Sequence, residues 1–251
     1  MLYRSFALGA LVVLAAGCLE QSDNAKDSAS NNASAATDCP VLPGTPAEIA
    51  QTPRADQNLE LLALSLSAGL TADQAVYDRV VQDVQSIRSL QPQLADVTYH
   101  PAYVNQILVG ASPDTLEEMD RGAYKSWDCL NQQYKLKSKT RASTAMVLQF
   151  DGIFDLKQLS ALYAALPEVT YAEPNLILGG ASSIYVTPDT SQWHYVLDVA
   201  SDDCEAGCIN HQLYYFVTND GGAAEYVADW LVAPDTQAPE WVAKYWSDVR
   251  N

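Results

Sequence analysis

The first 38 residues are not expected to contribute to a folded core. Residues 20–38 contain no aromatic residue and no aliphatic residue larger than alanine. A segment without such side chains cannot bury a core, so we expect it to be disordered. The uncharged apolar run Phe6–Ala16 is too short for a membrane-spanning helix, which needs about 20 residues. A folded structure is therefore expected within residues 39–251, which suffice for one large domain or two small ones.

The apolar run belongs to a recognisable export sequence. Arg4 precedes it, and Leu14-Ala15-Ala16-Gly17-Cys18 ends it. This stretch resembles the lipobox of bacterial lipoproteins, although an ordinary secretory signal is the alternative. The resemblance implies a signal peptide at residues 1–17, diacylglycerol on the Cys18 thiol, and anchoring to a membrane through acyl chains. Leu19, where such proteins carry Asp to stay at the inner membrane, implies delivery to the outer membrane.

After this signal, residues 18–38 would serve as lipid anchor and flexible tether. About 20 flexible residues have a root-mean-square reach of about 25 Å. The formal net charge of the chain is −17, and a strongly acidic surface disfavours nucleic acid and anionic lipid. The basic run from Lys135 to Arg141 is interpreted as a solvated loop. The expected partners are therefore the membrane, through the anchor, and an envelope protein or peptide, but not nucleic acid.

Four cysteines remain once Cys18 is lipidated. An even number in an oxidising compartment favours disulfides. Gly207 permits a tight turn between Cys204 and Cys208, so these two are paired, which leaves Cys39 for Cys129. The alternative is a zinc site made by the first pair with two histidines, His194 and His211. No metal or other cofactor is expected.

Residues 53–92 predict a helical hairpin. Asp56 is expected to cap the first helix and Gly69 to end it, and Thr71-Ala72-Asp73-Gln74 reads as the capping box of the second. The charged residues of the second helix lie off its apolar stripe and are interpreted as a solvated face: Arg79, Asp83 and Arg88.

The middle of the chain alternates strand and helix patterns. Buried strands are predicted at 106–111, 145–150 and 169–172, and helices after Ser112, at 123–134 and after Asp155. This order suggests a split βαβ unit. Leu166–Asn175 resembles the end of a subtilisin-type prosegment, which implies a ferredoxin-like fold and the chaperone and inhibitor roles of such segments.

From Ser183 onward the pattern is mostly β. Asn219-Asp220-Gly221-Gly222 is typical of a hairpin turn, and a final helix is expected at Glu240–Val249 with its aromatic residues packed. Asp203–Ile209, with its DCxxGCI pattern, resembles a segment of uncharacterised secreted bacterial proteins, as does Leu59–Arg88. The sequence thus predicts one α+β domain over 39–251, or two parts, a helical and split βαβ part at 39–180 and a β-rich part at 181–251.

No catalytic motif is present. The chain has no nucleophile elbow, no zinc-protease motif and no phosphate or dinucleotide loop. His100, His194 and His211 are interpreted as structural. An acidic cluster near Asp203 is interpreted as a solvated loop, with a weak calcium site as the alternative: Asp198, Asp202, Asp203 and Glu205. We therefore expect a non-catalytic binding module, and the alternative is a hydrolase of envelope polymers that uses a carboxylate pair.

Overall fold

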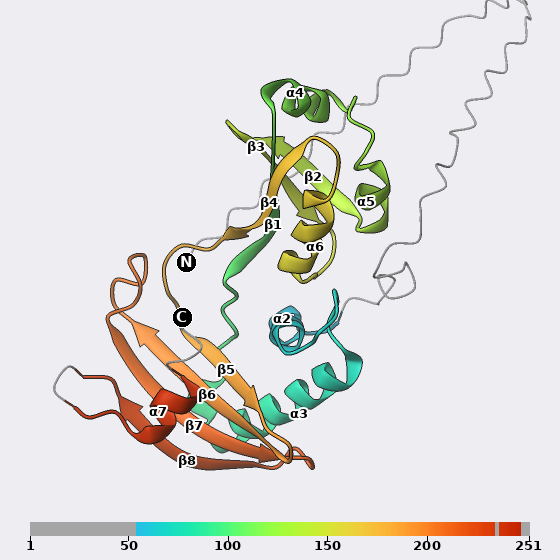
Figure 1. Cartoon of the computed structure of the whole chain (residues 1–251). Coiled ribbons are helices and arrows are strands. Elements are labelled where there is room, and N and C mark those ends of the chain that lie inside the picture. The colour runs from blue at the N-terminus through green and yellow to red at the C-terminus, as the bar shows by residue number, and fades with distance from the viewer. Residues whose placement is uncertain (1–53, 234–235, 247–251) are drawn as a thin grey trace, which may run out of the picture. The chain divides into compact units, whose positions relative to one another are not determined.

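The computed structural model describes residues 54–233 and 236–246, which belong to one compact unit of the chain (Figure 1). They form helices and two separate antiparallel four-stranded sheets, which confirms the predicted α+β class. The signal sequence, Cys18, the tether and Cys39 lie outside the described residues. Within those ranges, no helix combines the length and the apolar character needed to cross a membrane.

The predicted helical hairpin is present as α2 (Gln57–Ser65) and α3 (Gln74–Leu90), followed by a short 3₁₀ turn, η1 (Pro92–Leu94). The Asp56 carboxylate caps α2 as expected. The predicted capping box was wrong, because the N-cap of α3 is Asp73, two residues after Thr71. The Asp73 carboxylate accepts from two backbone N–H groups. A carboxylate directly before the first helical residue reaches those donors, whereas Thr71 lies too far ahead of them.

The first sheet has the predicted split βαβ topology. It comprises β1 (Tyr103–Ala111), β2 (Leu136–Arg141), β3 (Ala145–Phe150) and β4 (Val169–Leu176), in the order β2-β3-β1-β4. Each neighbouring pair is antiparallel. The connections contain α4 (Pro113–Arg121), α5 (Asp128–Gln133) and α6 (Leu156–Ala164), and this order of strands and helices is the ferredoxin-like one.

Two local predictions in this unit were wrong. The basic run forms edge strand β2 rather than a loop, and its charges recur every second residue, which is the period of a strand. The helix expected at 123–134 is reduced to α5, because α4 ends at Gly122 in a left-handed conformation (φ 74°) and residues 123–127 form an irregular turn.

One face of the first sheet packs on its helices. Ile107 and Val109 of β1 and Leu148 of β3 are fully buried there. Edge-to-face contacts join Phe150 to Phe154 and Tyr163. On the opposite face the ring of Tyr171 covers Gly110, where a Cβ atom would lie 2.0 Å from the ring. A larger residue at this position would therefore have to displace the Tyr171 ring.

The second sheet comprises β5 (Ser183–Pro188), β6 (Gln192–Ser201), β7 (Asn210–Asn219) and β8 (Ala224–Leu231), in that order. The turn between β7 and β8 is the one predicted. Figure 1 shows α3 on one face and α7 (Glu240–Tyr245) on the other. α2 and α3 share a core with this sheet, in which Val84 and Ile87 pack with Tyr195 and Phe216. That core joins residues on both sides of position 180.

The predicted packing role of the C-terminal aromatic residues is confirmed for α7. Tyr245 and Trp246 are buried against Val196, Leu213 and Tyr215 of β6 and β7. Both faces of the second sheet are therefore covered along its central strands.

Candidate functional site

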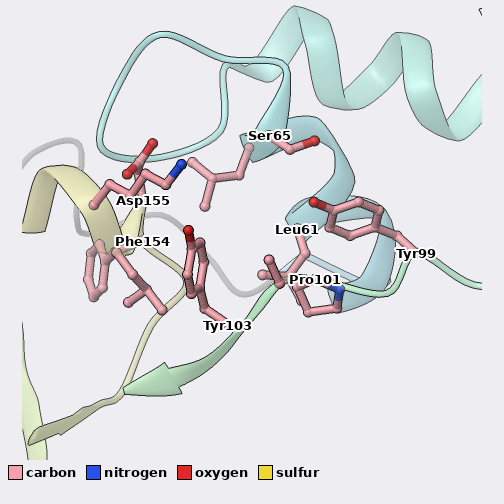
Figure 2. A pocket seen from close by; sticks show the side chains of 11 residues that line it. Leu61, Ser65, Tyr99, Pro101, Tyr103, Phe154 and Asp155 are labelled. Carbon is pink, nitrogen blue, oxygen red and sulfur yellow. The ribbon is translucent and has the colours of Figure 1, made fainter. Parts of the chain in front are cut away.

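A pocket of about 310 Å³ opens beside α2 (Figure 2). Three segments that are distant in the sequence line it: α2, the extended residues before β1, and the start of α6. The lining residues are Leu61, Leu64, Ser65, Tyr99, Pro101, Ala102, Tyr103, Phe154, Asp155, Leu156 and Lys157. No sequence motif marks this set, because each segment contributes only three or four of its members.

Two tyrosines supply polar groups to a largely apolar wall. Figure 2 shows Tyr99 at one end of the pocket, Phe154 and Asp155 at the other, and Tyr103 between them. Burial raises the pKa of Tyr99, while a hydrogen bond with Ser65 lowers it and the nearby Tyr103 raises it further. The hydroxyls of both tyrosines can donate or accept hydrogen bonds.

Asp155 and Lys157 place one negative and one positive group on the lining. The Asp155 carboxylate caps α6, accepting from the backbone N–H of Gln158 at 2.9 Å. The Lys157 Nζ atom lies 5.7 Å from the centre of the Tyr103 ring. Within the described ranges, neither charged group takes part in an ion pair.

The edges of the two sheets form a second kind of surface. Lys137, Lys139 and Arg141 occupy edge strand β2, Pro174 lies in β4, and Pro188 ends β5. Charged residues and proline protect an edge from pairing with another chain. β8 has no Lys, Arg or Pro, and its exposed apolar residues are Tyr226, Val227 and Leu231. Among the edge strands of the described residues, β8 is the one without a basic residue or a proline, although it carries the carboxylates of Glu225 and Asp229 and a register shift at Val227.

The histidines make separate structural contacts. The Nδ1 atom of His194 lies 2.8 Å from the Tyr215 hydroxyl. The ring of Tyr245 stacks on the His194 ring, with 4.2 Å between the ring centres. Burial lowers the pKa of His194, and the positive charge of Lys244 lowers it further. His100 is half-buried, and its backbone N–H donates to the Ser183 hydroxyl at 3.0 Å.

His211 anchors the turn between β6 and β7. Its Nδ1 atom lies 2.8 Å from the Asp198 carboxylate, and its Nε2 atom lies 3.1 Å from the Cys208 carbonyl oxygen. Asp198 is only 1% exposed. The interpretation of Asp198 as part of a solvated acidic loop was therefore wrong, because it is the buried partner of a histidine 13 residues away.

Cys204 and Cys208 form the disulfide predicted for them. The bond consumes both thiols that the zinc alternative needs. Within the described ranges, no group of three His, Cys, Asp or Glu side chains is arranged to hold a metal ion. Cys129 is also disulfide-bonded, but its predicted partner Cys39 lies outside the described residues, so that pairing stays a prediction.

Asp83 is the buried charge that sequence reasoning missed. It was interpreted as solvated, yet it is 0% exposed. One carboxylate oxygen accepts from Tyr195 at 3.0 Å, from Thr218 at 2.6 Å and from Arg79 at 2.8 Å. Burial lowers the pKa of Arg79, but hydrogen bonds with Asp83 and Asp220 outweigh it and raise that pKa overall. This network fastens α3 to the second sheet.

Comparison of the chain with protein-family models, curated proteins and solved structures finds no match.

Proposed function

We propose that this chain is a lipid-anchored protein of the bacterial outer membrane that acts as a non-catalytic binding module and captures an extended polypeptide along β8. The lipobox-like stretch ending at Cys18 supports the anchor. The proposal of binding rests on the edge of β8, which has no basic residue and no proline. Its outer side has no strand neighbour within the described residues. Beyond Ala224, whose N–H donates to the Ser86 hydroxyl, its outward backbone groups can pair with an added strand.

The side chains of β8 favour an apolar and basic partner. Val227, which lies at the register shift between β7 and β8, is 47% exposed and Leu231 is 57% exposed, and both offer apolar contacts to an added strand. Glu225 and Asp229 are exposed carboxylates on the same strand. They attract lysine and arginine, and the net charge of −17 acts in the same direction at longer range.

The pocket supports binding more than hydrolysis. Its lining contains a single carboxylate, that of Asp155, and this group caps α6. A glycosidase-type mechanism needs two facing carboxylates. The hydrolase alternative therefore has no support from the lining of this pocket.

Peptide selection tests the binding surface. A phage-displayed peptide library is selected on the detergent-solubilised full-length protein, and enriched peptides are titrated by fluorescence anisotropy. We expect sequences that alternate apolar residues with Lys or Arg and that bind more weakly at high salt. A Val227→Lys, Leu231→Lys variant should lose at least about tenfold in affinity, since it places two charges on the edge.

The control is the matched variant Leu176→Lys, Leu178→Lys, which changes two exposed leucines outside β8 and should bind like the wild type. Selected peptides whose affinity is equal for the wild type and the β8 variant would contradict the proposal.

Processing tests the anchor. Globomycin should cause a larger precursor to accumulate, and Cys18→Ala should release the protein from membranes, because the acyl chains would have no attachment atom. Full partition of Cys18→Ala with the membrane fraction would show that lipid on this cysteine is not the anchor.

A further inference from the structure

The size of the pocket beside α2 sets the size of its occupant. Small-molecule sites have volumes of about 300–1,000 Å³, and this pocket, at about 310 Å³, lies at the lower end of that range. The pocket therefore suits a small metabolite rather than a cofactor or an oligosaccharide.

Charge determines the kind of ligand. Asp155 and Lys157 lie two positions apart on the lining and carry opposite charges. Neither is neutralised by an ion pair in the described part of the chain. A purely anionic ligand would match Lys157 but be repelled by Asp155, and a purely cationic ligand would meet the reverse. A zwitterion matches both groups.

The remaining wall is mostly apolar. Leu64, Phe154 and Leu156 are buried side chains that line the pocket, and Leu61 and Pro101 lie opposite the charged end in Figure 2. Burial of an apolar group against these residues would contribute about 25 cal/mol per Å² of apolar surface removed from water. The polar groups along this wall are the hydroxyls of Ser65, Tyr99 and Tyr103.

We propose that this pocket binds a free α-amino acid with an apolar side chain of the size of leucine or phenylalanine. Lys157 pairs with the ligand carboxylate. The Asp155 oxygens accept from the Gln158 N–H at 2.9 Å and from its side-chain amide at 3.3 Å, and their remaining lone pairs accept from the ligand ammonium group. The hydroxyl of Tyr103 adds a hydrogen-bonding group between the two ends. The site is independent of the β8 surface, since none of its lining residues belongs to β8.

Isothermal titration of the full-length protein with L-leucine and L-phenylalanine tests this inference. Both should bind, whereas L-leucinamide and N-acetyl-L-leucine should bind at least about tenfold more weakly, because each lacks one of the two charges. L-Serine should fail to bind, because it has no apolar side chain. Equal affinity for leucine and both of its blocked forms, or no binding of either amino acid at millimolar concentration, would overturn the proposal.

Two variants remove the charges without removing the fold. Asp155→Asn keeps a good helix cap, and Lys157→Gln changes an exposed side chain. Each should weaken leucine binding at least about tenfold. The matched controls are Asp56→Asn, which changes the cap of α2 outside the pocket, and Lys125→Gln, which changes another exposed lysine.

Thermal melting of all four variants confirms that each is folded. If both pocket variants are folded and bind leucine like the wild type, the amino acid does not bind here. Peptide capture by β8 should be unchanged in these variants, so failure of this inference is distinguishable from failure of the proposed function.

Discussion

Removal of the Asp83 carboxylate should destabilise the fold strongly, although the residue looks like a surface charge in the sequence. In Asp83→Ala the buried hydroxyls of Tyr195 and Thr218 lose their acceptor, at about 1–3 kcal/mol each. Arg79 loses its buried partner as well, and breaking a buried pair costs about 3–5 kcal/mol. Because these contributions overlap, we expect a total loss of about 3–5 kcal/mol.

The conservative variant should separate the charge from the hydrogen bonds. Asp83→Asn keeps the volume and one acceptor oxygen but loses the charge, so we expect a smaller loss of about 1–3 kcal/mol. The order of stability should therefore be wild type, Asp83→Asn, Asp83→Ala. Each kcal/mol corresponds to roughly 2–4 °C in melting temperature for a domain of this size.

Urea unfolding followed by tryptophan fluorescence, with the disulfides intact, measures these losses. Asp78→Ala is the control, because Asp78 lies on the same helix and is exposed. A surface substitution of this kind changes the free energy of unfolding by less than about 0.5 kcal/mol. The reasoning is refuted if Asp83→Ala is no more destabilising than Asp78→Ala.

Three further predictions concern other parts of the fold. Gly110→Ala should cost about 1–3 kcal/mol by overpacking against the Tyr171 ring, and most of this loss in urea unfolding should disappear in a Tyr171→Ala background. Because burial lowers the pKa of His194, the folded state binds its proton less readily than the unfolded state, so stability should fall as the pH drops below about 6.5. The melting temperature should vary less with pH across this range in His194→Gln than in the wild type. Non-reducing peptide mapping should join Cys39 to Cys129, a bridge contributing about 4–5 kcal/mol in the loop-entropy description, and any other partner for Cys129 would exclude that pairing.

Local signals predicted most of the elements correctly. Asp56, Ser112 and Asp155 cap α2, α4 and α6 as their sequences indicate, because a cap acts within three residues of itself. The alternation of strands and helices between β1 and β4 likewise gave the split βαβ topology. At β2 the charge of the side chains outweighed their period of two, and the strand was interpreted as a loop.

Long-range contacts left no comparable signal. The partners of Asp83, Tyr195 and Thr218, lie 112 and 135 residues away, while its neighbour Arg79 at i−4 gives it the appearance of an ordinary surface pair. The same limit applies to the pocket, whose lining comes from three segments. A sequence pattern shows which residues share a helix face but not which distant side chains meet that face.

The packing of α2 and α3 on the second sheet has a consequence for biogenesis. Tyr103 pairs with Leu176, and the Ile177 N–H donates to the Ala102 carbonyl, so the first sheet begins and ends at the same place. Residues 103–176 thus form an insertion that can complete its own core. This insertion separates the helical hairpin from residues 183–231, which together form the other core. The chain is synthesised from its N-terminus. The apolar stripe of the hairpin therefore stays exposed until residues 183–231 have been made. During that interval the hairpin is the segment that chaperones and proteases will find first.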